Sequence, residues 1–171
     1  MYKRQDLGVE WKGIDFSMFW QGVAKRDLWL DGLMFWGISG GEWQSTGLKE
    51  HLDYYRPENT TSVFGPNTNA YFPKMYMSKD MNQKVQTRYL QNGAYARLKN
   101  IQLGYTFPTQ IINKLHMQKL RVYVSAENVL TITSLPSGFD PETTYSSYSD
   151  GNSGKTYPLQ TTISFGLHAT F

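Results

Sequence analysis

Apolar and polar residues alternate along the last part of the chain. The apolar members of this alternation share one parity: Ile163, Phe165, Leu167, Ala169 and Phe171. A period of two is typical of a β-strand with one apolar face. The alternation runs over about ten residues, the length that a tilted strand needs to cross a bilayer. We therefore predict a strand over residues 159–171.

The same alternation predicts four further strands, at residues 6–11, 14–23, 95–107 and 119–131. Lys12 and Gly13, between the first two, are typical of a tight hairpin turn. The third strand contains an irregularity, because Arg97 and Lys99 share the parity of the apolar Ile101. Either a β-bulge shifts the register there, or these two residues lie beyond the hydrocarbon.

The connections between the predicted strands alternate between short and long. Residues 12–13 and 108–119 are short, and the second of these is expected to form a helical turn; residues 24–86 and 134–158 are long. A structureless loop of roughly 60 residues counts against a compact soluble domain. Long outer loops and short periplasmic turns are typical of an outer-membrane barrel. The pattern therefore favours a barrel whose last strand runs from the outside to the periplasm.

The amino-acid composition agrees with such a sheet. The 12 Tyr, 9 Phe and 5 Trp suit either the aromatic girdles of a barrel or a sugar-binding β-sandwich. The chain has no apolar run of about 18 residues, which excludes a transmembrane helix. Its 17 Lys and Arg are scattered, so no nucleic-acid partner is predicted. Cysteine is absent, which excludes disulfides and thiolate metal sites.

The end of the chain fits the spacing of the signal that the barrel-assembly machinery reads. The four matching residues, called the assembly motif below, are Ser164, Gly166, Ala169 and Phe171. An open sheet edge cannot be left in lipid, so the last strand of a barrel must pair with the first. A terminal aromatic can lie at the membrane interface. The alternative is the C-terminal strand of some other β-protein.

Six blocks in order carry a resemblance to a known family. They are WKGIDFSMFWQGV (11–23), HLDYYRPE (51–58), AYFP (70–73), YARLKNIQLGYTFP (95–108), LRVYVSAENVLTIT (120–133) and GFDPE (138–142). Together they resemble the C-terminal end of the SusC/RagA family of TonB-linked outer-membrane transporters of Bacteroidota. The fold class that we predict is therefore all-β, an antiparallel meander of about five strands. The resemblance implies that it is the C-terminal part of a plugged transmembrane barrel of about 22 strands.

The resemblance also implies a location and partners. We expect the cell outer membrane, a SusD-like surface lipoprotein, the barrel-assembly machinery, and TonB acting through N-terminal parts that precede this segment. The expected substrate is an oligosaccharide or a peptide, and neither a cofactor nor an enzymatic activity is expected. A barrel needs at least about eight strands, so the segment should not transport alone. The alternative is a soluble carbohydrate-binding β-sandwich.

The first five residues have a different explanation. Met1–Gln5 is the translation of GTG TAT AAG AGA CAG from a GTG start, and this string resembles a transposon end used in sequencing libraries. We therefore expect residues 1–5 to be an artefact of sequence assembly and the natural protein to begin near Asp6. The alternative is an ordinary N-terminus.

Aromatic residues of the long loops are the candidate contacts to a substrate or partner. These candidates are Trp36, Trp43, Tyr54, Tyr55, Tyr71, Phe72, Tyr145 and Tyr148. Their rings could stack on sugars while Asn67 and Asn69 bind hydroxyls; alternatively, they pack the loops together or against the lipoprotein. The polar Gln21, Gln102 and Arg121 are candidates for lining the barrel lumen.

Two apparent chemical motifs are expected to be structural. Residues 37–41 match the G-x-S-x-G nucleophile elbow around Ser39. That motif needs a preceding strand, a following helix, a His and an acid, and the sequence offers no such setting. Asp140 and Glu142 lie in GFDPE, which predicts a turn fixed by Pro141 rather than a metal site.

Overall fold

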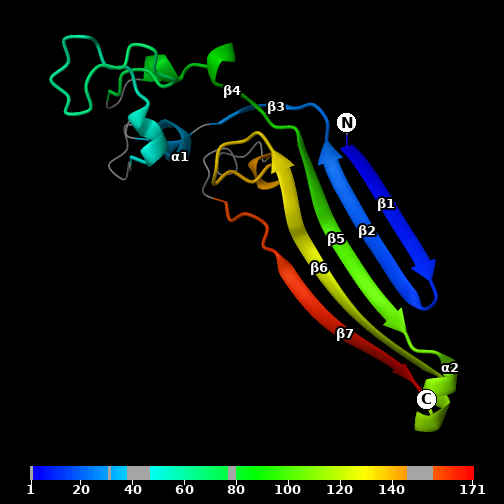
Figure 1. The fold of residues 1–171 in the computed structure, drawn as a ribbon. Coiled ribbons are helices and arrows are strands. Elements are labelled where there is room, and N and C mark those ends of the chain that lie inside the picture. Colours follow the sequence, from blue (N-terminus) through cyan, green and yellow to red (C-terminus); the bar gives the residue numbers. More distant parts are fainter. Residues whose placement is uncertain (1, 31, 38–46, 77–79, 146–155) are drawn as a thin grey trace. The chain divides into compact units, whose positions relative to one another are not determined.

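The computed structural model describes residues 2–30, 32–37, 47–76, 80–145 and 156–171 (Figure 1). The chain divides into two compact units, and each is described by itself. The sheet unit consists of Met1–Arg26, Asn92–Leu135 and Leu159–Phe171, and the loop unit consists of Asp27–Gln91 and Pro136–Pro158. The strands that were predicted from alternation all belong to the sheet unit.

The sheet unit is an antiparallel meander. Its described strands are β1 (Tyr2–Trp11), β2 (Ile14–Val23), β5 (Tyr95–Thr106), β6 (Lys119–Thr133) and β7 (Thr162–Thr170). They pair in the order β1-β2-β5-β6-β7, and every neighbouring pair is antiparallel. The predicted all-β meander is confirmed.

Both short connections lie at the end of the sheet where the chain also terminates (Figure 1). Lys12 and Gly13 have φ values of 48° and 88°, the left-handed geometry that a two-residue hairpin turn requires. The β5–β6 connection contains α2 (Thr109–Ile112) and the 3₁₀ turn η5 (Asn113–Leu115). The predicted tight turn and helical turn are therefore present.

Two strands begin at other residues than expected. β1 begins at Tyr2 rather than near residue 6, because its first residues pair with the end of β2, as in Tyr2↔Val23. Backbone pairing needs no side-chain alternation, so the pattern could not show this extension. β7 begins at Thr162 rather than at 159, because its ladder with β6 ends at the pair Glu127↔Thr162 and the next residue of β6, Asn128, takes a φ of 53°.

The predicted irregularity in the third strand is a β-bulge. Phe19 pairs with Asn100 while the next residue, Trp20, pairs with Leu98, so the ladder between β2 and β5 shifts register at Lys99. The extra residue reverses the alternation of β5 upstream of this point. Arg97 therefore lies on the polar face of the sheet, and the alternative position beyond the hydrocarbon is not needed to explain it.

Strand register places apolar residues beside one another across the sheet. One row consists of Val9, Phe16, Leu103, Val124 and Phe165. Phe165 is 84% exposed and Val9 is 65% exposed, so this apolar face is not covered. The opposite face carries polar residues and glycines.

The loop unit has its own small core. Its elements are β3 (Asp27–Trp29), α1 (Leu33–Trp36), η2 (Lys49–Leu52), η3 (Asp80–Gln83), η4 (Thr87–Tyr89), β4 (Leu90–Asn92), which pairs with β3, and η6 (Thr143–Tyr145). Leu30, Phe35, Trp36, Phe72 and Tyr89 are buried. The segment 24–86 is therefore ordered by aromatic packing in its described part. Among the described residues, no helix is long and apolar enough to cross a membrane.

Candidate functional site

Tyr71 is the best-anchored candidate contact residue. Its backbone N–H donates to Asp53 Oδ2 at 3.1 Å, and its carbonyl oxygen accepts from Arg88 Nε at 3.3 Å. Its hydroxyl oxygen accepts from Gln91 Nε2 at 3.0 Å. Asp53 is itself held by Asn67 Nδ2 at 2.8 Å. A half-exposed ring that is already fixed in place loses little conformational entropy when a ligand binds.

Aromatic rings surround Tyr71 and support it. Its ring contacts Phe72 edge-on at 4.9 Å and Tyr89 at 5.5 Å between centroids. Trp36 lies behind them, 4.9 Å from Tyr89, and is 1% exposed. Trp36 is thus a core residue here, not the surface contact expected from the sequence, because the loop unit closes over it. Phe72 is also mostly buried.

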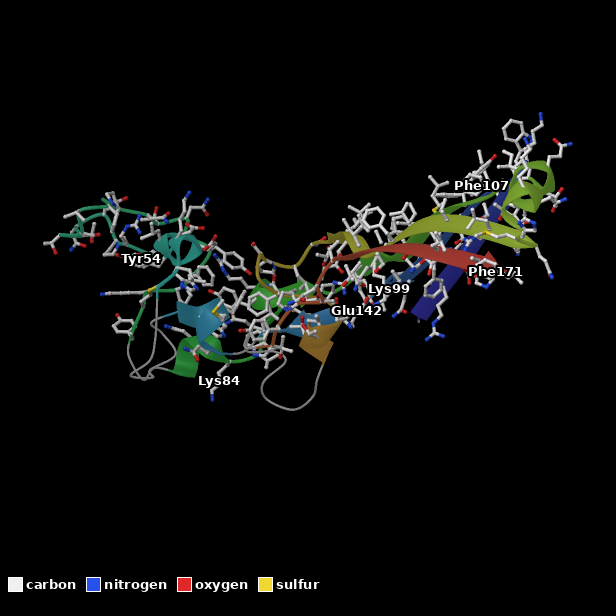
Figure 2. All side chains as sticks on the ribbon, turned by 90° about the horizontal axis from the view of Figure 1, so that it is seen from below. Tyr54, Lys84, Lys99, Phe107, Glu142 and Phe171 are labelled. Carbon is white, nitrogen blue, oxygen red and sulfur yellow. The ribbon has the colours of Figure 1, made fainter. Side chains whose placement is uncertain are left out.

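Tyr54 has a structural partner on its ring. The Arg56 guanidinium lies 4.6 Å from the Tyr54 ring centroid. It also donates to the carbonyl oxygens of Leu52 at 2.8 Å and Gly65 at 2.6 Å. Arg56 therefore ties the loop together and covers one side of Tyr54 (labelled in Figure 2). Tyr55, by contrast, is 41% exposed and remains open to a ligand.

Two grooves in the loop unit share Tyr71 and Phe72 as walls. The cationic groove, of about 450 Å³, is also lined by Tyr55, Lys74, Asn82 and Arg88. The acidic groove, of about 500 Å³, is also lined by Met34, Glu50, Asp53 and Phe139. The amide and hydroxyl groups that line the grooves can form hydrogen bonds with polar ligands. Because one groove is cationic and the other acidic, the two together favour a ligand that carries both a positive and a negative charge. The structure thus brings Tyr55, Tyr71 and Phe72 together from the predicted set.

The other predicted loop positions contribute less to the described structure. Trp43, Tyr148 and Ser39 lie outside the described residues, and Tyr145 ends the short turn η6. Asp140 forms the predicted turn: its Oδ1 accepts the Glu142 N–H at 2.8 Å, and its carbonyl oxygen accepts the Thr144 N–H at 3.0 Å. In the described parts of the chain, no three His, Asp or Glu residues gather as a metal site would require.

The polar face of the sheet carries an ion pair that the sequence did not reveal. Arg121 Nε on β6 donates to Asp15 Oδ1 on β2 at 2.9 Å, and Arg121 Nη2 pairs with Asp15 Oδ2. The two side chains meet over Gly104 of β5, which lies between them. The predicted lumen residues Gln102 and Arg121 lie on this face. A glycine inside a strand often marks a place where another group approaches the backbone closely. Gly104 was therefore the one feature of the sequence that could have pointed to this ion pair.

The assembly motif lies along the free edge strand. Ser164 pairs with Ser125, Gly166 with Tyr123, and Ala169 with Leu120. Phe171 follows the last paired residue, at the tip of β7 (Figure 2), and is 75% exposed. The motif residues therefore alternate as predicted, with Ala169 on the apolar face and Gly166 on the polar face.

No family model matches the chain. The chain is 27% identical over 170 residues to TonB-dependent receptor P3 of Formosa agariphila, and 24% identical over 169 residues to TonB-dependent receptor P26 of the same organism. Each match covers 95% of this chain but only 15% and 16%, respectively, of the receptors. The chain therefore spans a small part of the length of these curated relatives.

Solved structures agree with these matches. The chain is similar to the RagAB peptide importer in its open-open state, with a TM-score of 0.65 and 25% identity over 99% of this chain and 17% of that one. The closed-closed state gives a TM-score of 0.64 and 25% identity, over 97% of this chain and 16% of the other.

The meander is thus similar in sequence to a stretch of TonB-dependent receptors and similar in fold to part of the RagAB peptide importer. The resemblance to the SusC/RagA family that the sequence indicated is confirmed. These relatives are named as receptors and importers, which supports a non-enzymatic role.

Proposed function

We propose that this chain forms part of the barrel wall and outer loops of an outer-membrane importer of oligosaccharides or other nutrients. The observation that carries the proposal is the exposed apolar face, whose rows continue in register across β1, β2, β5, β6 and β7. Exposed apolar surface of this extent marks an interaction with a partner or a membrane. Strands of about ten residues with one apolar face match the hydrocarbon thickness.

The competing soluble β-sandwich would bury this face. Two packed sheets interdigitate their apolar side chains, whereas Phe165 and Leu167 are 84% and 67% exposed. Lipid is the covering that suits these side chains. The importer would be completed by further strands, would be driven by TonB, and would work with a SusD-like lipoprotein at the cell surface. The assembly motif on β7 would offer the barrel-assembly machinery a recognition sequence.

The loop unit would supply substrate contacts at Tyr71. Its backbone is held by Asp53 and Arg88 and its hydroxyl by Gln91, and the residue forms a wall of both grooves. A sugar could stack on the ring and bond the neighbouring amide groups. A peptide is the second candidate, because the Lys74–Arg88 side of Tyr71 is cationic and the Glu50–Asp53 side is acidic.

Uptake by cells that produce the complete gene product tests this proposal. A deletion strain should lose uptake of one oligosaccharide or peptide, and the restored protein should fractionate with the outer membrane. Tyr71→Ala should reduce uptake at least several-fold, whereas Tyr157→Ala should not, because Tyr157 is 88% exposed and lines neither groove. A product that is soluble without detergent would contradict the importer.

Charge-neutralising variants distinguish the two substrate classes. Glu50→Gln and Lys74→Gln each remove one charge and leave a neutral polar side chain in its place. Both should weaken uptake of a peptide with free termini, because each groove would lose its attraction for one end. Neither should change uptake of a neutral oligosaccharide.

A further inference from the structure

One row of residues crosses the polar face of the whole sheet. It consists of Glu10, Asp15, Gly104, Tyr123 and Gly166, each opposite the next on neighbouring strands. Two of its five members are glycines. Neither glycine has a positive φ, so backbone conformation does not explain why glycine occupies these positions. The side chains that lie above the two glycines do explain it.

The space above Gly104 is filled by the ion pair. A Cβ built on Gly104 would lie 2.6 Å from Arg121 Nη2 and 2.5 Å from both Asp15 carboxylate oxygens. Carbon atoms do not approach these groups so closely. Arg121 on β6 can therefore reach Asp15 on β2 only because β5 has no side chain between them.

The space above Gly166 is filled by an aromatic ring. A Cβ on Gly166 would overlap the Tyr123 ring and its hydroxyl oxygen. The ring cannot swing toward β5, because the Arg121 guanidinium lies there, 4.9 Å from the ring centroid. Tyr123 thus lies flat over β7, between Arg121 and Gly166.

Hydrophobic alternation alone leaves the register of β7 incompletely specified. A slip by one residue would turn the apolar face of β7 to the polar side and is strongly disfavoured. A slip by two residues keeps each face and is not excluded by the pattern. Such a slip would put Ser164 or His168 opposite Tyr123 in place of Gly166, and either side chain would occupy the space of the ring.

We propose that Arg121 and Tyr123, lying over Gly104 and Gly166, form a register lock that excludes two-residue slips of β7. Gly166 is then required in the assembly motif because the Tyr123 ring packs directly on its backbone. This requirement is separate from any recognition of the motif by the assembly machinery. The lock joins β2, β5, β6 and β7 in one packed row.

Disulfide reporters can measure the register, because the chain has no cysteine of its own. In the complete gene product in cells, Glu127→Cys with Thr162→Cys reports the observed register, in which these positions are opposite. Ser125→Cys with Thr162→Cys reports a slip of two residues in one direction. Glu127→Cys with Ser164→Cys reports the same slip in the other direction.

Gly166→Ala should lower the yield of the native cross-link roughly tenfold and raise a slipped one, since overpacking of this kind is destabilising. Gly8→Ala is the matched control, because its Cβ would have 4.0 Å of clearance from the nearest atom, Phe16 O. In the Gly166→Ala background, Tyr123→Ser should raise the native cross-link to the level that Tyr123→Ser shows with Gly166 intact, whereas Tyr123→Phe, which keeps the ring, should not.

Tyr123→Ser alone, with Gly166 intact, should also raise the slipped cross-link, which tests the lock without a change in the motif. A Gly166→Ala, Tyr123→Ser double variant that gives less native cross-link than Tyr123→Ser alone would overturn the proposal, because the glycine would then be needed by the assembly machinery itself. Native cross-linking that is unchanged in Gly166→Ala would overturn it as well.

Discussion

Arg121 donates from Nε to Asp15 Oδ1 at 2.9 Å, although the two residues are 106 positions apart in the chain and a strand lies between them. The pair is bidentate, and the Arg121 and Asp15 side chains are 22% and 25% exposed, respectively. A forked contact of this kind depends on the planar guanidinium group. It fixes three strands relative to one another on the polar face.

Loss of either partner should weaken the sheet. We expect Asp15→Asn to lower the free energy of unfolding by about 1.5 kcal/mol, in the range of a hydrogen bond to a charged group. Arg121→Lys should cost a similar amount, because an ammonium group cannot make the forked contact. Urea unfolding of the complete gene product in detergent measures both. The double variant should cost less than the sum of the two; additive effects would show that the pair is not coupled.

Much of the sheet can be predicted from the sequence, because the alternation of apolar and polar residues shows which residues lie on each face of a strand. Ile163, Phe165 and Leu167 predict β7 without further information, and Lys12-Gly13 predicts the hairpin. Alternation does not report register, so the Asp15–Arg121 pair could not be found from it. The bulge was expected near Arg97, but that the two ladders skip Lys99 emerges only from the pairing on both sides of β5.

The loop unit follows much less from the sequence. Its aromatic residues were identifiable as candidates, but the sequence does not separate the buried Trp36 from the half-exposed Tyr71. That distinction depends on which segments close over each ring, and the closing segments have no periodic pattern. Asp53, Arg88 and Gln91, which anchor Tyr71, carry no motif.

Trp36 should be the most sensitive residue of the loop unit. It is 1% exposed and contacts Trp29, Phe35, Phe72 and Tyr89 through ring pairs. We expect Trp36→Ala to destabilise the unit by about 3–5 kcal/mol through a cavity. Trp36→Phe should cost less, because it also removes a buried indole N–H that has no hydrogen-bond partner in the described structure.

Protease added to intact cells can report this effect. Cleavage within residues 24–86 should become faster in Trp36→Ala cells, because the outer loops face the medium in our account. Met34→Ala is the control on the same helix, since Met34 is 38% exposed. Equal cleavage of the two variants would show that Trp36 does not hold the loop unit together.

Tyr89 should make the loop unit sensitive to alkali. Burial raises the pKa of the Tyr89 phenol above its usual 10.0, although the nearby Arg88 charge acts in the opposite direction. The folded unit then holds the phenolic proton more tightly than the unfolded chain does. This contribution to stability is complete below about pH 10 and is lost as the pH rises through the folded pKa.

A thermal melt followed by near-ultraviolet circular dichroism measures this dependence, because Trp36 lies 4.9 Å from the Tyr89 ring. The melting temperature should fall more steeply above about pH 10 in the unchanged protein than in Tyr89→Phe. Identical profiles would mean that Tyr89 ionises equally in the folded and unfolded states.

The central claim is that one face of the sheet contacts lipid and the other faces a polar lumen. Single cysteines placed at Ser164, Phe165, Leu167 and His168, in the complete gene product in cells, test it most directly. Gly166 is left unchanged, because a Cβ there would overlap the Tyr123 ring. A water-soluble maleimide should label the Ser164 and His168 positions and leave the Phe165 and Leu167 positions unlabelled, as a period of two requires. Labelling of the Phe165 and Leu167 positions, whose side chains are exposed here, would show that water rather than lipid covers this face and would contradict the account.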